Sequence, residues 1–211
     1  MPENIHQDQP IETTGESLDA ADAAVLMLHG RGAMPGSVLA LAREFDTPGV
    51  AYLAPAAANR TWYPNPFTAP VESNQPHLDS ALATVGERLA EIEDAGVGPD
   101  AILLLGFSQG ACLASEFVAR TPRRYGGLAA LSGGLIGPDV SSDDYAGDLD
   151  GTPAFVGCSD SDPHIPRERV EATSAILENL GADVTERIYP GMGHTINAEE
   201  VEFVADLVAG L

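Results

Sequence analysis

Two kinds of hydrophobic pattern alternate along this chain. Short, continuous apolar runs are typical of strands buried on both faces of a parallel sheet, and they predict strands near 24–29, 50–54, 101–106, 127–132, 153–157 and 184–189. Longer stretches repeat apolar residues at helical spacing, and they predict helices near 35–45, 78–95, 108–120, 167–180 and 197–209. Because the two alternate to the C-terminus without repeats or a low-complexity linker, the pattern predicts one α/β domain over residues 21–211, with a mostly parallel sheet flanked by helices.

Three segments lie before or between these elements. Residues 1–20 form a polar, acidic arm without the basic start and apolar core of a signal peptide, so we expect it to be partly disordered or to carry a short strand. Residues 55–77, rich in Pro and Asn, are the candidate for a short lid or pocket wall. Residues 136–151, with five aspartates, are expected to be an exposed loop. The length leaves little room for a large cap.

Candidate chemistry appears where the apolar run 101–105 ends in Gly106-Phe107-Ser108-Gln109-Gly110. A G-x-S-x-G sequence between a strand and a helix is the layout of a nucleophile elbow, a turn too tight for side chains at its flanks. The motif alone is weak, and it is also compatible with a glycine-rich turn whose serine caps a helix. The strand pattern before it and the helical pattern after it favour the first interpretation, in which Ser108 is the nucleophile of a hydrolase.

A serine nucleophile needs a general base, and in this layout the base follows the serine in the chain. Two histidines do so. His194 is the candidate base, because it lies on a glycine-flanked loop after the last predicted strand. His164, close to two prolines, is assigned to the pocket wall or the surface.

The base in turn needs an orienting acid. Asp160 and Asp162 both follow the predicted strand 153–157. Asp162 is preferred because Pro163 fixes the chain just beyond it. Asp160 stays open as the alternative, with a possible part in shaping the loop through Asx-type hydrogen bonds.

Acyl transfer also builds negative charge on a carbonyl oxygen, which backbone N–H groups stabilise. The amide of Gln109, directly after the nucleophile, is one expected donor. The second is expected on a loop after an early strand, and the loop 29–32 assigns it to the amide of Arg31. His29 precedes the nucleophile, which is the wrong order for a base, so it is expected to be a structural loop residue.

In their order and spacing these motifs resemble the small carboxylesterase/phospholipase family of the α/β-hydrolases, which includes the acyl-protein thioesterases. The resemblance covers about residues 21–211 and rests on Leu28-His29-Gly30-Arg31-Gly32, the serine motif, Leu131-Ser132-Gly133-Gly134, the segment 160–166 and Gly193-His194. It implies an α/β-hydrolase fold without a cofactor, a catalytic set of Ser108, Asp162 and His194, and oxyanion amides at Arg31 and Gln109.

Two departures limit what the resemblance implies. Thioesterases of this family often have an apolar residue where Arg31 stands, and the loop Trp62-Tyr63-Pro64 differs from the eukaryotic thioesterase pattern. A lipidated-protein substrate is therefore not inferred. The segments 60–64 and 72–76 resemble instead a phospholipase/carboxylesterase-like subgroup.

The leading hypothesis is a serine carboxylesterase that hydrolyses small to medium esters through an acyl-enzyme on Ser108. Alternatives are an acyl-thioesterase or lysophospholipase and, in another class, a non-catalytic binding protein with the same fold. Trp62, Tyr63 and Phe107 are candidates for the substrate pocket. For Phe107 packing beneath the elbow is an equal alternative, and Trp62 and Tyr63 have the alternative of covering the sheet edge.

The amino-acid composition limits which binding partners, which salt conditions and which cellular location we expect. The formal net charge is −22 and all ten basic residues are Arg, so nucleic acid and anionic membrane surfaces are disfavoured. An acidic, lysine-free composition resembles that of proteins from salt-accumulating halophiles, and it suggests that folding and activity need molar salt. Cys112 and Cys158 are expected to be buried free thiols of a cytoplasmic protein. No metal-ligand spacing is present and no membrane insertion is expected; a homodimer is suggested by analogy alone.

Overall fold

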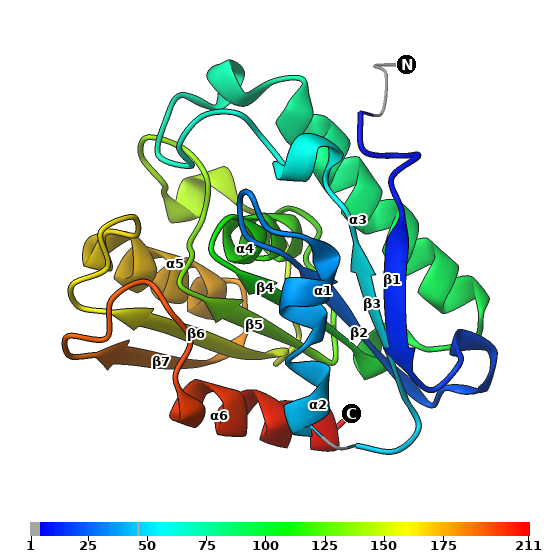
Figure 1. Cartoon of the computed structure of the whole chain (residues 1–211). Coiled ribbons are helices and arrows are strands. Elements are labelled where there is room, and N and C mark those ends of the chain that lie inside the picture. Colours follow the sequence, from blue (N-terminus) through cyan, green and yellow to red (C-terminus); the bar gives the residue numbers. More distant parts are fainter. Residues whose placement is uncertain (1–4, 46) are drawn as a thin grey trace.

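The computed structural model describes residues 5–45 and 47–211, and in this part of the chain seven strands form one sheet (Figure 1). Their spatial order is β1-β3-β2-β4-β5-β6-β7. All neighbours pair in parallel except β1, which runs antiparallel to β3 at one edge. The strands are β1 (Ile11–Gly15), β2 (Ala23–Leu28), β3 (Val50–Pro55), β4 (Ile102–Phe107), β5 (Gly127–Leu131), β6 (Pro153–Ser159) and β7 (Asp183–Tyr189).

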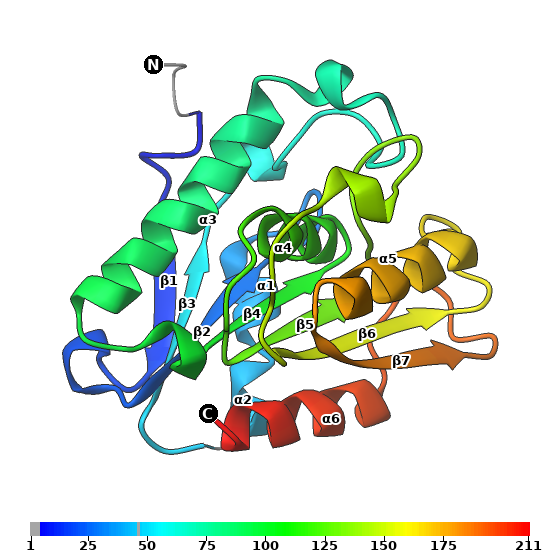
Figure 2. The same ribbon diagram turned by 180° about the vertical axis from the view of Figure 1, so that it is seen from behind.

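Helices cover both faces of this sheet, as the views from the two sides show (Figures 1 and 2). One face carries α3 (His77–Asp94), α4 (Gln109–Arg120) and α5 (Arg167–Asn179). The other carries α1 (Pro35–Leu39), α2 (Ala42–Phe45) and α6 (Ala198–Ala209). Each face has its own hydrophobic core, because the side chains of the central strands alternate between them. The predicted α/β fold with a mostly parallel sheet is therefore confirmed.

The prediction of a single helix over 35–45 is wrong. The amide of Ala40 still bonds four residues back, to Gly36. The amides of Leu41, Arg43 and Glu44 instead bond three residues back, which tightens the backbone into a turn between α1 and α2. The spacing of apolar residues does not distinguish the two kinds of hydrogen bonding, so it did not predict the break.

The N-terminal arm carries a strand, one of the two possibilities left open for it. β1 lies along β3, and the chain then turns at Gly15, whose φ of +80° favours glycine. The loop 136–151 is mostly exposed, as expected, but Ile136, Gly137 and Leu149 are buried. Among the described residues, no helix is both long and apolar enough to cross a lipid bilayer.

Parallel strands end at a common edge, and this edge gathers the residues of interest. Ser108 follows β4, Asp162 follows β6 and His194 follows β7. The loop after β2 brings Arg31 to the same side. Open α/β sheets bind ligands outside the carboxyl ends of their strands, so the topology alone places these groups where a site is expected.

Candidate active site

Ser108 lies in a sharp turn between β4 and α4. Its φ of 56° and ψ of −118° are unusual for a residue with a side chain. The turn also needs the glycines beside it: a Cβ on Gly106 would lie 2.2 Å from the carbonyl oxygen of Gly110, and one on Gly110 would lie 2.0 Å from that of Leu28. The geometry is that of the nucleophile elbow, with the serine side chain raised from the backbone.

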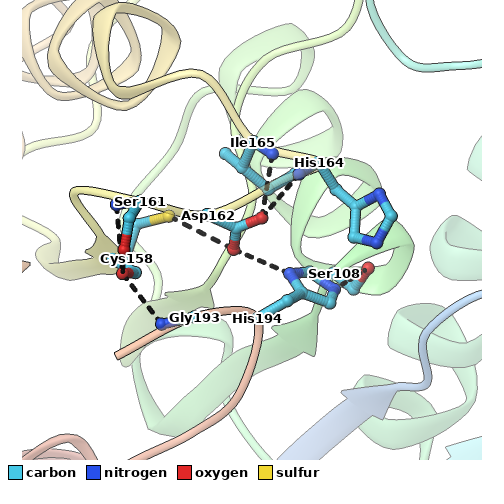
Figure 3. A network of polar contacts seen from close by, with 9 residues as sticks. Ser108, Cys158, Ser161, Asp162, His164, Ile165, Gly193 and His194 are labelled. Atoms are coloured by element: carbon cyan, nitrogen blue, oxygen red, sulfur yellow. Dashed lines mark hydrogen bonds and ion pairs between the residues drawn. The ribbon is translucent and has the colours of Figure 1, made fainter. Parts of the chain in front are cut away.

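Ser108, His194 and Asp162 form a hydrogen-bonded chain (Figure 3). Nε2 of His194 lies 2.9 Å from Oγ of Ser108, and Nδ1 lies 2.7 Å from Oδ2 of Asp162. A carboxylate only accepts hydrogen bonds, so the Nδ1–H of His194 donates to Asp162 and Nε2 is free to accept the serine proton. The Asp162 side chain is fully buried and that of His194 is 19% exposed.

The surroundings of Asp162 keep it ionised. Burial alone would raise its pKa, but hydrogen bonds from His194 and from the backbone N–H groups of His164 and Ile165 outweigh burial and hold the pKa of Asp162 below its ordinary value. Asp160 has a different position: its Oδ1 accepts from the amide of Gly191, 2.8 Å away. The structure thus brings Asp162 to His194 and uses Asp160 to shape the loop that carries the histidine.

Ser159, which sequence reasoning did not single out, holds the loop that carries His194. Its Oγ accepts from the amides of Ser161 and Gly193, at 3.2 and 3.0 Å, and so ties the loop after β6 to the loop after β7. The His194 ring lies between Phe107 and His164, with ring centroids 5.0 and 4.9 Å away. The position of Ser159, directly before Asp160 at the end of β6, was the signal that could have identified this support.

The residues of the two expected oxyanion donors, Arg31 and Gln109, line the larger of the cavities at Ser108. Gln109 is the first residue of α4, so its N–H has no partner within the helix and forms part of the positive end of the helix dipole. Gly30 brings the loop after β2 close: a Cβ there would lie 3.3 Å from that of Ser108. The amide of Gly32 donates to the carbonyl of Arg60 at 2.7 Å, which fixes the turn that contains Arg31.

One wall of the site is the segment 57–67, here called the wall loop. The Arg31 guanidinium donates to three of its carbonyl oxygens, those of Tyr63, Pro64 and Asn65, at 2.8–2.9 Å. The Gln109 side chain accepts from the amide of Trp62 and donates to the carbonyl of Tyr63. The side chains of Arg31 and Gln109 therefore hold the wall loop. The backbone N–H groups of the same two residues remain free to serve as oxyanion donors. Sequence reasoning assigned a role in the site only to those amides and left the role of the Arg31 side chain open.

Two cavities meet at Ser108 and His194. The larger has a volume of about 540 Å³ and is lined by Arg31, Tyr63, Pro64, Pro66, Phe67, Ser108, Gln109, Cys112, His164, Ile165 and His194. The second, of about 440 Å³, is lined by Gly30, Arg31, Ala33, Ser37, Val38, Leu41, Phe107, Ser108, His194, Thr195 and Ile196. Both volumes are typical of sites for small molecules.

The three candidates for the substrate pocket lie in different places. Tyr63 lines the larger cavity and Phe107 the smaller one. Trp62 lines neither: it is fully buried, and its indole Nε1 donates to the carbonyl of His29 at 2.9 Å. Trp62 thus supports the wall from behind. His164 lines the larger cavity, in agreement with its assignment to the pocket wall.

Comparison with known proteins agrees with this geometry. The family model described as phospholipase/carboxylesterase matches residues 10–210, nearly the whole chain. The chain belongs to the phospholipase/carboxylesterase family. The resemblance that the motifs indicated is thereby confirmed.

Relatives within the phospholipase/carboxylesterase family carry related names. A crystal structure of a phospholipase/carboxylesterase from Dyadobacter fermentans is 44% identical, covers 96% of this chain and 97% of its own, and superposes with a TM-score of 0.91. Acyl-protein thioesterase 1 of Gibberella zeae is 33% identical over 53% of this chain and 48% of its own length. A probable carboxylesterase of Arabidopsis thaliana, SOBER1-like, is 26% identical over 68% and 56%. The chain thus spans about half the length of the curated relatives it matches.

Both cysteines of this family member are free and buried. Cys112 lines the larger cavity, and burial raises the pKa of its thiol to about 12. Burial and the neighbouring carboxylate of Asp162 raise the pKa of Cys158 to about 12 as well. A thiol is a nucleophile only as its thiolate, so neither cysteine is an effective nucleophile near neutral pH.

Proposed function

We propose that this protein is a serine carboxylesterase that hydrolyses small to medium carboxylic esters. One observation carries the proposal: the chain from Ser108 Oγ through His194 to the buried Asp162, with bonds of 2.9 and 2.7 Å. These are hydrogen-bond distances within reach of proton transfer. Family membership supports the reaction class, and the names of several relatives include carboxylesterase.

In the proposed reaction Ser108 Oγ attacks the ester carbonyl carbon while its proton passes to Nε2 of His194. The amides of Arg31 and Gln109 donate to the oxyanion of the tetrahedral intermediate. Asp162 holds the ring in place and stabilises the imidazolium. His194 then returns the proton to the departing alkoxide, which leaves as the alcohol and gives an acyl-enzyme on Ser108. Water then attacks this acyl group while its proton passes to His194; the bond to Oγ breaks, the acid is released and His194 returns the proton to Ser108 Oγ.

We assign the acyl group to the larger cavity and the alcohol to the smaller one. The larger cavity contains Gln109, a proposed oxyanion donor, and apolar walls at Phe67 and Ile165. Apolar walls stabilise an aliphatic acyl chain by removing its surface from water. A volume of about 540 Å³ suits a small to medium acyl group.

The test is hydrolysis of p-nitrophenyl acetate, butyrate and octanoate by the wild type and by Ser108→Ala. We expect activity in the wild type and loss of about four orders of magnitude or more in the variant. Arg167→Met, a change at an exposed ion pair on α5, is the matched control. No hydrolysis by a folded wild type would contradict the proposal, as would a Ser108→Ala variant that keeps its activity.

A thioesterase is the second candidate, because several relatives are named acyl-protein thioesterase. The two serine reactions share the same site and differ in the group that leaves. Matched esters and thioesters with the same acyl chain separate them through the ratio of their kcat/KM values. A non-catalytic binding protein would not react with a fluorophosphonate at Ser108, whereas both enzymes would.

We also propose that the protein requires high salt for full stability. A net charge of −22 repels itself in the folded state unless counterions screen it. Thermal unfolding should therefore shift to higher temperature as KCl rises from 0.1 M to molar levels (about 3 M), and a shift in the opposite direction would contradict this. A cytoplasmic location, which the two free thiols favour, and a homodimer stay predictions.

A further inference from the structure

Two buried histidines outside the catalytic set lie beside the only tryptophan of the chain. His6 comes from the N-terminal arm and His29 from the loop after β2, and both are about 1% exposed. Their ring centroids lie 5.4 and 5.2 Å from that of Trp62. We call these two residues the histidine clamp.

The histidine clamp binds two consecutive backbone amides at the start of the wall loop. The N–H of Ala57 donates to Nε2 of His29 and the N–H of Ala58 donates to Nδ1 of His6, both at 3.0 Å. An amide N–H only donates, so each of these ring nitrogens must be unprotonated. Both rings are therefore neutral in this arrangement.

The other nitrogen of each ring then carries the proton and also has a partner. Nε2–H of His6 donates to the carbonyl of Trp62 at 3.0 Å, and Nδ1–H of His29 donates to the carbonyl of Gly30 at 2.8 Å. The backbone amide of His6 donates to Oγ of Ser80 on α3 at 3.2 Å. Every ring nitrogen of the clamp is thus satisfied only while both rings are neutral.

The segment that the clamp holds is the one that reaches the proposed oxyanion donors. Arg60, two residues beyond the clamped amides, accepts from the amide of Gly32 beside Arg31. Trp62 donates from its backbone to the side chain of Gln109. A shift of residues 57–62 would therefore be transmitted to both loops that flank Ser108.

We propose that His6 and His29 are positioning residues that, as neutral imidazoles, hold the wall loop and through it the oxyanion amides, so that the N-terminal arm is part of the active site. The inference rests on the proposed esterase function for its effect on rate. The structural part, a neutral clamp around Trp62, stands without that function.

Acid is the natural perturbation of the clamp. Burial lowers the pKa of His6, and the charges of His77, from the first turn of α3, and of His29 lower it further; the hydrogen bonds of its ring only partly offset this. Burial likewise lowers the pKa of His29. The ordinary pKa of histidine is 6.5. As the pH falls below this value, these histidines bind protons in the unfolded chain but not yet in the folded clamp, so the stability of the clamp decreases with decreasing pH. Protonation of the folded rings, at lower pH still, removes both acceptors.

Trp62 makes this directly observable, since it is the sole source of tryptophan fluorescence. We expect a reversible change in that fluorescence with a midpoint below pH 6.5, at a pH where far-UV circular dichroism is still that of the folded protein. The double variant His6→Gln/His29→Gln should lack the transition, because an amide side chain has no proton to gain. His164→Gln, on the loop after β6, is the matched control and should keep it.

Activity tests the positioning role. Glutamine offers an acceptor and a donor in place of the ring nitrogens, so His6→Gln should keep kcat within about threefold, whereas His6→Phe should lose about 10- to 100-fold in kcat with a smaller change in KM. Fluorescence that changes only together with unfolding would overturn the clamp, and equal kcat in the two His6 variants would overturn its link to catalysis. If His6→Phe does not fold, the pH profile of His6→Gln tests the link to catalysis instead. The kcat of His6→Gln should then decline less steeply in acid than the kcat of the wild type. The fluorescence needs no substrate, so failure of the clamp and failure of the esterase proposal remain distinguishable.

Discussion

Replacing Arg31 by Met would separate the two parts that this residue has in the site. The substitution removes the guanidinium that donates to three carbonyl oxygens of the wall loop, and it leaves the backbone amide that we propose as an oxyanion donor. The side chain is exposed at the mouth of both cavities. Water competes there for the same carbonyl groups, which reduces the net value of each bond.

The expected size follows from the number of bonds. A hydrogen bond contributes about 0.5–1.5 kcal/mol net, and exposure places three such bonds at the low end, about 1–2 kcal/mol in total. Because 1.4 kcal/mol is a factor of ten, the fraction of molecules with a displaced wall loop should rise about 5- to 30-fold. Tyr63 and Pro64, whose carbonyls the guanidinium holds, line the larger cavity and would meet substrate and transition state alike. Residues 57–62, which reach the oxyanion loops, keep their contacts with the histidine clamp. KM should therefore rise severalfold, at most by the factor above, with kcat changed less.

The assay is the measurement of kcat and KM for p-nitrophenyl butyrate, with Arg31→Lys and Arg167→Met beside Arg31→Met. Lysine keeps the charge and loses the planar fork, so it should resemble Met more than Arg. Arg167 forms an exposed ion pair with Glu171 on α5, and its substitution should behave as the wild type. An unchanged KM in Arg31→Met would refute the reasoning, and a large fall in kcat would show that the change reaches the oxyanion amides as well.

Three further predictions concern the acid, the elbow and α6. Asp162→Asn should lower kcat/KM by about four orders of magnitude, because the wrong histidine tautomer results. Asp160→Asn should lower kcat/KM by about tenfold or less. Equal losses of kcat/KM in steady-state assays would contradict the assignment of the acid. Gly110→Ala should lower the free energy of unfolding by about 3 kcal/mol or more, since its Cβ would lie 2.0 Å from a carbonyl oxygen of β2; chemical denaturation with an unchanged midpoint would refute the steric argument. Burial raises the pKa of Glu200, at the start of α6, to about 7 from 4.5, so the folded state binds a proton that the unfolded state has lost. Stability should therefore fall as the pH rises from 4.5 through 7, and melting curves of Glu200→Gln should show a weaker dependence.

Much of the fold and of the candidate site was predictable from sequence because local chemistry specifies it. Strands buried on both faces must be continuous apolar runs, and a tight turn that exposes a serine needs glycine at fixed positions before and after it. His194 was predictable for a similar reason: it is one of two histidines after Ser108 and it follows the last strand. In each case the signal lies within a few residues of the feature.

Contacts between distant segments were not predictable in this way. The Arg31 guanidinium meets carbonyl groups 32–34 residues away, and His6 meets the amide of Ala58 across 52 residues. Ser159 likewise acts on a glycine amide 34 residues further along the chain. Backbone carbonyls and amides are the same at every residue, so these pairings leave no pattern in the sequence.

The sequence by itself therefore determined the parallel sheet, the elbow and the order of the candidate serine, aspartate and histidine along the chain. Only the tertiary structure decided which of two aspartates faces His194, where the N-terminal arm lies, and what the side chains of Arg31 and Gln109 hold. The physical reason is that a strand, a helix or a tight turn is specified by neighbours in the chain, whereas the partner of a long polar side chain is specified by the packing that brings remote backbone within about 3 Å.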